Sequence, residues 1–239
     1  YVDRMSDVKS ALAYLKSRKA TSNSKTGLLG HSEGGLIAAM IAAGSEDIGF
    51  IVLMAAPGIT GAEMILLQTK LSNKAQGISD EKTQTELDFL KIIFDEVIAA
   101  NDLAHVKSQL SDSLKSHREL LPDGMTDEEI DQYLGVFAAP WFQRILKSDP
   151  ASSLEQVQCP VLALNGAKDL QIPPKENLGA IEAALKKGGN NKYTIKELPN
   201  LNHLFQEAAT GQEEEFVTIR QTISPVVLKM IMDWIGEHP

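Results

Sequence analysis

Cysteine is nearly absent from this chain, because Cys159 is the only one among 239 residues. A single cysteine cannot form a disulfide within the chain, so the fold does not depend on an oxidising compartment. The count does not select a compartment, and a cytoplasmic and a secreted location both stay open. Cys159 precedes a proline at the head of an apolar run, and we expect it to be packed rather than reactive.

Positive charge and long apolar stretches are also scarce. The chain has 23 Lys and Arg against 32 Asp and Glu, for a formal net charge of −9. A nucleic-acid partner is not expected, because such binding needs a basic surface to displace counterions from phosphates. No apolar run approaches the roughly 20 residues of a membrane-spanning helix. No group of His, Cys or carboxylates has convincing metal-ligand spacing, so we expect no metal and no other cofactor.

What the chain does have is an alternation of helix and strand patterns. Steps of three and four between apolar residues predict a helix over 3–19, and small apolar residues predict another over 34–44. Continuous apolar runs predict buried strands over 26–31 and 48–58. The segment 61–149 then reads as helix throughout, without a convincing strand.

The alternation returns in the last part of the chain. We expect strands over 159–166 and 191–199, a helix over 173–189 and a closing helix over 221–239. Four apolar residues are expected on the core face of that last helix: Val226, Met230, Ile231 and Trp234.

Together these patterns predict an α/β fold with a mostly parallel sheet flanked by helices. We divide the chain into a first core part (1–60), an inserted all-helical module (61–149) and a second core part (150–239).

Three polar residues each follow a predicted strand: Ser32, Asp169 and His203. The carboxyl ends of parallel strands meet at one edge of a sheet, so these side chains should come together there. A serine hydroxyl needs a base to remove its proton, a neutral histidine can do so near pH 7, and a carboxylate can orient that histidine. We therefore predict a catalytic triad with Ser32 as nucleophile, His203 as base and Asp169 as the orienting acid.

The residues around Ser32 match G-x-S-x-G, from Gly30 to Gly34. Glycines allow a sharp strand-to-helix turn that exposes the serine. The backbone N–H of Glu33, at the positive end of the next helix, would then face the oxyanion. A serine that merely caps a helix in a glycine-rich turn would give a similar sequence, so this interpretation stays open as well.

The acid and the base have competitors too. Asp102 and Asp149 could serve as the acid, although neither follows a predicted strand. His203 could be structural, since the chain uses three histidines away from the motifs: His105, His117 and His238. The chain order and the positions at strand ends carry the prediction, not any single residue.

Three segments resemble the α/β-hydrolase superfamily, in its esterase and serine-aminopeptidase-like branch. "LLGHSEGG" is similar to the nucleophile elbow, "CPVLALNGAKDLQIPP" to the acid strand and loop, and "LPNLNHLFQ" to the histidine loop. The resemblance implies that the helical module is a lid. In this superfamily several strands precede the helix expected at 3–19, and the second oxyanion donor comes from a loop there. We therefore expect a C-terminal portion of a longer hydrolase, with Glu33 as its only oxyanion donor.

The function expected from the triad and the resemblance is serine esterase activity on a small ester or acyl substrate. A serine aminopeptidase, a thioesterase, and a catalytically incomplete or purely binding module are also compatible with the sequence. Four residues are candidates for the substrate pocket: His31, Phe137, Trp141 and Phe142. Each of the three aromatic residues could instead belong to the core of the helical module. Missing first strands would leave a sheet edge exposed, which could pair with another copy of the chain or with the missing part of the same protein.

Overall fold

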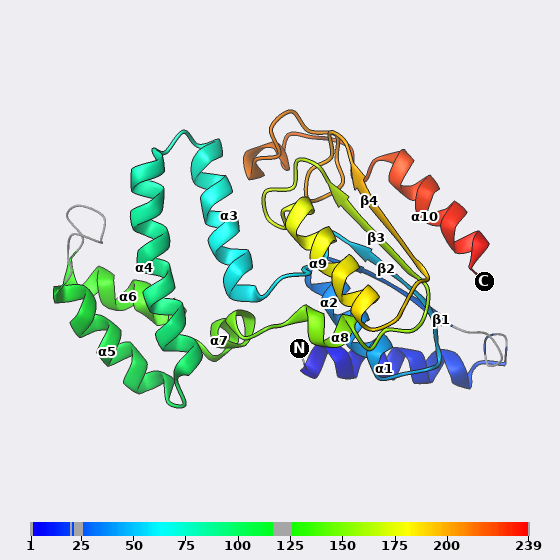
Figure 1. Cartoon of the computed structure of the whole chain (residues 1–239), viewed down its shortest axis with the longest axis horizontal. Helices are drawn as coiled ribbons and strands as arrows, with labels where there is room; N and C mark the ends of the chain where they lie inside the picture. Colours follow the sequence, from blue (N-terminus) through cyan, green and yellow to red (C-terminus); the bar gives the residue numbers. More distant parts are fainter. Residues whose placement is uncertain (1, 20, 22–25, 117–125, 239) are drawn as a thin grey trace. The chain divides into compact units, whose positions relative to one another are not determined.

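A computed structural model describes residues 2–19, 21, 26–116 and 126–238 (Figure 1). The chain forms two compact units. We call Tyr1–Ile59 together with Asp149–Pro239 the sheet unit, and Thr60–Ser148 the helical unit.

The sheet unit is built on four parallel strands in the order β1-β2-β3-β4. Their bounds are β1 Thr26–His31, β2 Ile48–Met54, β3 Val161–Gly166 and β4 Tyr193–Leu198. These strands confirm the predicted α/β fold class. Since all four run the same way, the residues that follow them gather at one edge of the sheet.

One face of the sheet is covered by α2 (Glu33–Ala43), α8 (Pro150–Leu154) and α9 (Pro174–Lys187). Alternate residues of the central strands point into this cluster, among them Ile51 and Ala163, both fully buried. Side chains of a strand alternate between the faces, so these positions contribute to only one of the two cores. α1 (Val2–Ser17) packs on the outside of the same cluster.

The other face is covered by α10 (Pro225–Glu237). The intervening strand residues, such as Val52 and Leu164, pack against it here. The helix buries Val227, Ile231 and Trp234. The prediction for its core face was therefore partly wrong, because Val226 is 63% exposed and Val227 is buried in its place.

β1 lies at one edge of the sheet, and within the described residues it pairs only with β2. Leu29 of this strand is 55% exposed, whereas every residue of β3 is buried. Leu29 aligns with Val52, which places it on the α10 face of the sheet. The side of β1 away from β2 is thus open in the part of the chain that the structure describes.

The helical unit contains five helices among its described residues: α3 Gly61–Ala75, α4 Asp80–Ala99, α5 Leu103–Ser116, α6 Asp127–Phe137 and α7 Pro140–Leu146. Its apolar core centres on Ile93, Phe94 and Leu134. Thr60 and Thr126 begin α3 and α6 with complete capping boxes, each paired with the glutamate three residues later. None of the described helices of either unit is both long and apolar enough to cross a membrane.

Candidate active site

Ser32 lies at a strained turn between β1 and α2. Its backbone dihedrals are φ 55° and ψ −123°, a combination that residues other than glycine rarely adopt. Backbone bonds hold it there: the Ser32 N–H donates to the Met54 carbonyl at 2.8 Å, and the Ser32 carbonyl accepts from Gly35 N–H at 2.9 Å. Strain of this kind costs about 1–3 kcal/mol and is common at functional sites.

The glycines of the turn do not all serve the same purpose. A Cβ on Gly30 would lie 2.1 Å from the Gly34 carbonyl oxygen, and one on Gly35 would lie 2.5 Å from the Cβ of Ala56. A Cβ on Gly34 would meet nothing within 4 Å. The close packing of the elbow therefore depends on Gly30 and Gly35, although the sequence pattern includes Gly34 instead of Gly35.

The Ser32 hydroxyl does not cap α2. It occupies the N-cap position but makes no capping hydrogen bond, and no hydrogen bond to any other described residue is present. The first N–H groups of a helix have no acceptor within it, so the Glu33 N–H is available to an external acceptor. The Glu33 side chain pairs with Arg4 of α1.

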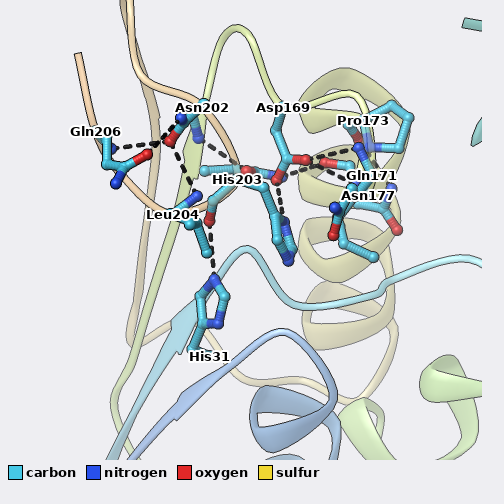
Figure 2. Close-up of polar contacts among 12 residues, drawn as sticks. His31, Asp169, Gln171, Pro173, Asn177, Asn202, His203, Leu204 and Gln206 are labelled. Atoms are coloured by element: carbon cyan, nitrogen blue, oxygen red, sulfur yellow. Dashed lines mark hydrogen bonds and ion pairs between the residues drawn. The ribbon is translucent and has the colours of Figure 1, made fainter. Parts of the chain in front are cut away.

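Asp169 lies in the loop that follows β3, and its side chain is fully buried. Oδ1 accepts from the backbone N–H groups of Gln171 at 2.9 Å and Ile172 at 2.8 Å. Oδ2 lies 2.9 Å from Nδ1 of His203 (Figure 2). Because Oδ1 is used by the loop, Oδ2 is fixed toward the imidazole.

His203 lies in the loop after β4, with a side chain that is 6% exposed. The loop is organised by Asn202, which is fully buried. Its Oδ1 accepts from Leu204 N–H at 3.0 Å and Gln206 N–H at 2.9 Å, and its Nδ2 donates to Oε1 of Gln206 at 2.9 Å (Figure 2). These bonds fix the backbone on both sides of the histidine.

The acid and histidine loops are joined to each other by their main chains. Lys168 N–H donates to the Leu201 carbonyl at 2.9 Å, and its Nζ donates to the Ala208 and Ala209 carbonyls. Gly166 approaches the Leu201 carbonyl so closely that a Cβ would lie 2.2 Å from the oxygen. The contact between Asp169 and His203 is therefore set by backbone geometry.

His31, the last residue of β1, connects the serine turn to the histidine loop. Its Nε2 lies 2.8 Å from the His203 carbonyl oxygen, and the two ring centroids are 4.7 Å apart (Figure 2). Burial lowers the pKa of His31 below its ordinary value, although the hydrogen bond to the carbonyl opposes the shift. His31 is therefore neutral at pH 7. Because His31 directly precedes Ser32, its contact with the His203 carbonyl joins the serine turn to the loop of the predicted base.

The structure thus brings His31, Asp169 and His203 together, with the Ser32 turn directly beside them. Among the described residues it shows no hydrogen bond between the Ser32 hydroxyl and His203, so the triad role of Ser32 stays a prediction. The role of the Glu33 N–H in binding an oxyanion is likewise a prediction.

The aromatic candidates for the pocket lie in the helical unit. Phe137 and Phe142 are buried there with their ring centroids 5.2 Å apart, which favours the interpretation that they form its core. Trp141 is 51% exposed, with its ring edge against Phe142.

The competing acids and histidines have other surroundings. Asp149 caps α8 by accepting from Ala151 N–H at 3.1 Å, and Asp102 lies in the helical unit. The His238 ring stacks on Trp234 and its Nδ1 contacts the Trp234 carbonyl at 2.8 Å. His105 lies in α5 of the helical unit, and His117 lies outside the described residues.

Sequence reasoning missed three buried asparagines that shape the strand ends. Besides Asn202, Asn165 donates to the Ile172 carbonyl at 2.7 Å and closes the acid loop. Asn177 accepts from Gly58 N–H at 2.8 Å and donates to the Pro173 carbonyl at 2.8 Å. Asn165 and Asn202 lie inside the two motifs quoted for the acid and histidine loops. An amide side chain at the end of an apolar run is the sequence feature that could have indicated their role.

The sheet and the residues at its carboxyl edge define the fold class of the sheet unit. A parallel sheet between helical layers, with a serine at a sharp strand-to-helix turn and an acid–histidine pair on later strand ends, is an α/β-hydrolase-type arrangement. Residues 6–119, just under half of the chain, match a family model described as the C-terminal part of BAAT and acyl-CoA thioester hydrolases. The chain is therefore similar to this family over residues 6–119, and the fold of the sheet unit is of the α/β-hydrolase type.

Solved structures with similarity to the chain include several hydrolases. An esterase of Pyrococcus furiosus is 14% identical with a TM-score of 0.43, covering 82% of this chain and 52% of the esterase. A monoacylglycerol lipase of Paleococcus ferrophilus is 18% identical with a TM-score of 0.47, covering 99% of this chain and 75% of the lipase. This chain spans about half the length of the Pyrococcus esterase. No curated protein matches the sequence significantly.

Proposed function

We propose that this chain carries the active site of a serine hydrolase that cleaves carboxylic esters through an acyl-enzyme on Ser32. The observation that carries the proposal is the buried contact of 2.9 Å between Asp169 Oδ2 and His203 Nδ1. A carboxylate on Nδ1 keeps that nitrogen protonated, which leaves Nε2 as the basic nitrogen of neutral His203.

In the proposed reaction, His203 Nε2 takes the hydroxyl proton of Ser32 as Oγ attacks the substrate carbonyl carbon. The oxyanion of the tetrahedral intermediate accepts a hydrogen bond from Glu33 N–H. The intermediate collapses, the alcohol leaves with the proton from His203, and the acyl group stays on Ser32. Water, deprotonated by the same histidine, then attacks the acyl-enzyme, and His203 returns the proton to Ser32 Oγ as the carboxylic acid is released.

A thioester is the second candidate substrate class, and the family match favours it, because the matching family is described by acyl-CoA thioester hydrolysis. The chemistry is the same except that a thiol leaves instead of an alcohol. Cleavage of aminoacyl amides by an aminopeptidase would use the same triad, and a non-catalytic binding module would use none of it.

The test is covalent labelling of the chain by a fluorophosphonate, followed by turnover assays. Wild type should be labelled at Ser32, and labelling should be lost in Ser32→Ala and in His203→Ala. Ser10→Ala and His238→Ala are matched controls outside the site and should label normally. An unlabelled wild type, or full labelling of Ser32→Ala, would contradict the proposal.

Rates on acyl p-nitrophenyl esters, acyl-CoA thioesters and aminoacyl anilides then separate the substrate classes. Hydrolysis of anilides alone would replace the esterase assignment by an aminopeptidase assignment.

A further inference from the structure

We propose that His31 is a positioning residue, whose Nε2–H holds the main chain of His203 and thereby aligns the base with the serine turn. The inference rests on the proposed function, since it concerns how the same site is aligned. In this proposal His31 orients the base and does not contact the substrate.

The donor direction follows from the chemistry of the contact. A main-chain carbonyl can only accept a hydrogen bond, so Nε2 of His31 must carry the hydrogen in the 2.8 Å contact with the His203 carbonyl. In the neutral imidazole the hydrogen is therefore on Nε2 and not on Nδ1.

His31 is the one side chain of the serine turn that bonds to the histidine loop in the described residues. Within that same part of the chain the hydroxyl of Ser32 has no partner, and the carboxylate of Glu33 pairs with Arg4. Other hydrogen bonds of the histidine loop are made within the loop by Asn202 and to the acid loop by Lys168. Two more join it to the segment before α10, from Ser224 N–H to the Phe205 carbonyl and from Gln206 Nε2 to the Gln221 carbonyl. Loss of the His31 bond would leave the loop fixed to the acid but free to shift relative to the serine turn.

The protonation state of His31 suits this role. The rings of His31 and His203 lie 4.7 Å apart, and the Phe205 ring lies 6.2 Å from His31. A positive charge on His31 would oppose the positive charge that His203 acquires when it accepts the serine proton. The carboxylate of Asp169 would offset part of this repulsion. Burial lowers the pKa of His31 and keeps it neutral, so it can donate its hydrogen bond without opposing the imidazolium of His203.

The test is a set of four variants of the chain in the fluorophosphonate assay, which reports the rate constant of labelling and its endpoint separately. His31→Leu keeps bulk but has no donor, His31→Gln places an amide N–H near the position of Nε2, and His31→Asn has an amide too short to reach. His238→Leu is the matched control, since His238 also contacts a main-chain carbonyl at 2.8 Å, outside the site.

We expect His31→Leu and His31→Asn to label about 10- to 100-fold more slowly, with a full endpoint and unchanged probe affinity, because small misplacements of a reacting group cost rates of this size. His31→Gln should recover to within about threefold of wild type, as expected if the donor is what matters. His238→Leu should not differ from wild type.

A purely structural role of His31 would lower the endpoint and leave the rate constant of the folded fraction unchanged, and that result would overturn the inference. Equal rates in the Leu, Asn and Gln variants would also overturn it. If Leu does not fold, the Asn and Gln pair decides. Normal labelling of wild type with no effect of the variants rejects the inference alone, whereas an unlabelled wild type rejects the proposed function and the inference with it.

Discussion

In the helical unit, α3 and α6 begin at Thr60 and Thr126, whose hydroxyls accept hydrogen bonds from the backbone three residues later. In the sheet unit, α2 begins at Ser32, which occupies the same position but whose hydroxyl accepts no capping bond. The helices of the helical unit follow local rules for helix starts. The serine turn departs from them, and its hydroxyl is left available for chemistry.

The backbone shows the same contrast. Four residues other than glycine have a positive φ in the described part of the chain, and all lie in the sheet unit: Ser32, Ala55, Asn200 and Phe205. Each follows one of the strands or stands beside His203. Departures from local rules that the surrounding structure maintains are concentrated where function is expected. The following substitutions test whether this difference between the two units holds.

The largest effect is expected from Asp169→Asn. The amide oxygen can still accept from Gln171 and Ile172, so the amide nitrogen would face Nδ1 of His203 and favour the wrong tautomer. We expect kcat to fall by about 10⁴ with little change in folding. Steady-state kinetics and circular dichroism measure the two. Asp149→Asn, at the cap of α8, is the control, and an equal loss there would contradict the assignment of the acid.

Gly30→Ala should be the most damaging change to stability. The new methyl group would lie 2.1 Å from a backbone oxygen of the elbow, and backbone cannot move aside as a side chain can. A loss near the upper end of about 1–3 kcal/mol is expected. Gly34→Ala meets open space in α2 and should gain about 0.5–1 kcal/mol from helix propensity. Urea denaturation measures both, and equal losses would refute the asymmetry between these glycines.

The third comparison tests capping directly. Thr126→Ala removes a capping box and should cost about 1 kcal/mol, whereas Ser32→Ala removes no capping bond and should change stability by less than about 0.5 kcal/mol. The two tryptophans make the measurement specific, because Trp141 lies in the helical unit and Trp234 in the sheet unit. Variants with Phe at one tryptophan would report each unit by fluorescence. A loss of about 1 kcal/mol in Ser32→Ala would restore the helix-cap interpretation.

A smaller effect concerns pH. The pKa of His31 is lowered in the folded chain, so the unfolded chain takes up the proton first as the pH falls below about 6.5. The contribution of His31 to stability is thus fully present above that pH and is lost as the pH falls toward the folded pKa. His31→Gln should flatten this part of a plot of unfolding free energy against pH between about 5 and 8. Plots of unfolding free energy against pH that run parallel for wild type and variant would contradict the lowered pKa of His31.

The weakest expected effect is association. A helix has no unpaired backbone edge, whereas β1 has one within the described residues. Leu29 of this strand is also exposed. We propose that a second copy of the chain pairs there, which light scattering at high concentration should detect. Leu29→Lys should reduce the association, because charges on edge strands oppose pairing. Val136→Lys, at an exposed apolar residue of α6, is the control. A wild type that stays monomeric would refute the pairing.

The four strands and the main helices could be predicted in order from the sequence, because apolar periodicity depends on residues close together in the chain. The short helix α8 was not predicted. The sequence predicted β1 and β3 to within about two residues, and it led to the α/β class. It also placed Ser32, Asp169 and His203 after strands, since the carboxyl ends of parallel strands share an edge. The core face of α10 was partly wrong, because Val226 and Val227 are equally apolar and only packing against the sheet selects Val227.

The hydrogen bonds between the groups of the site could not be predicted from the sequence and are seen only in the folded chain. The contact between Asp169 and His203 depends on backbone bonds between two loops 34 residues apart in the chain, and that between His31 and His203 spans 172 residues. The elbow needs a glycine at position 35 and not at position 34, because Ala56, which follows β2, lies against Gly35. Local pattern carries no information on such contacts, because they arise when separate strands are brought side by side.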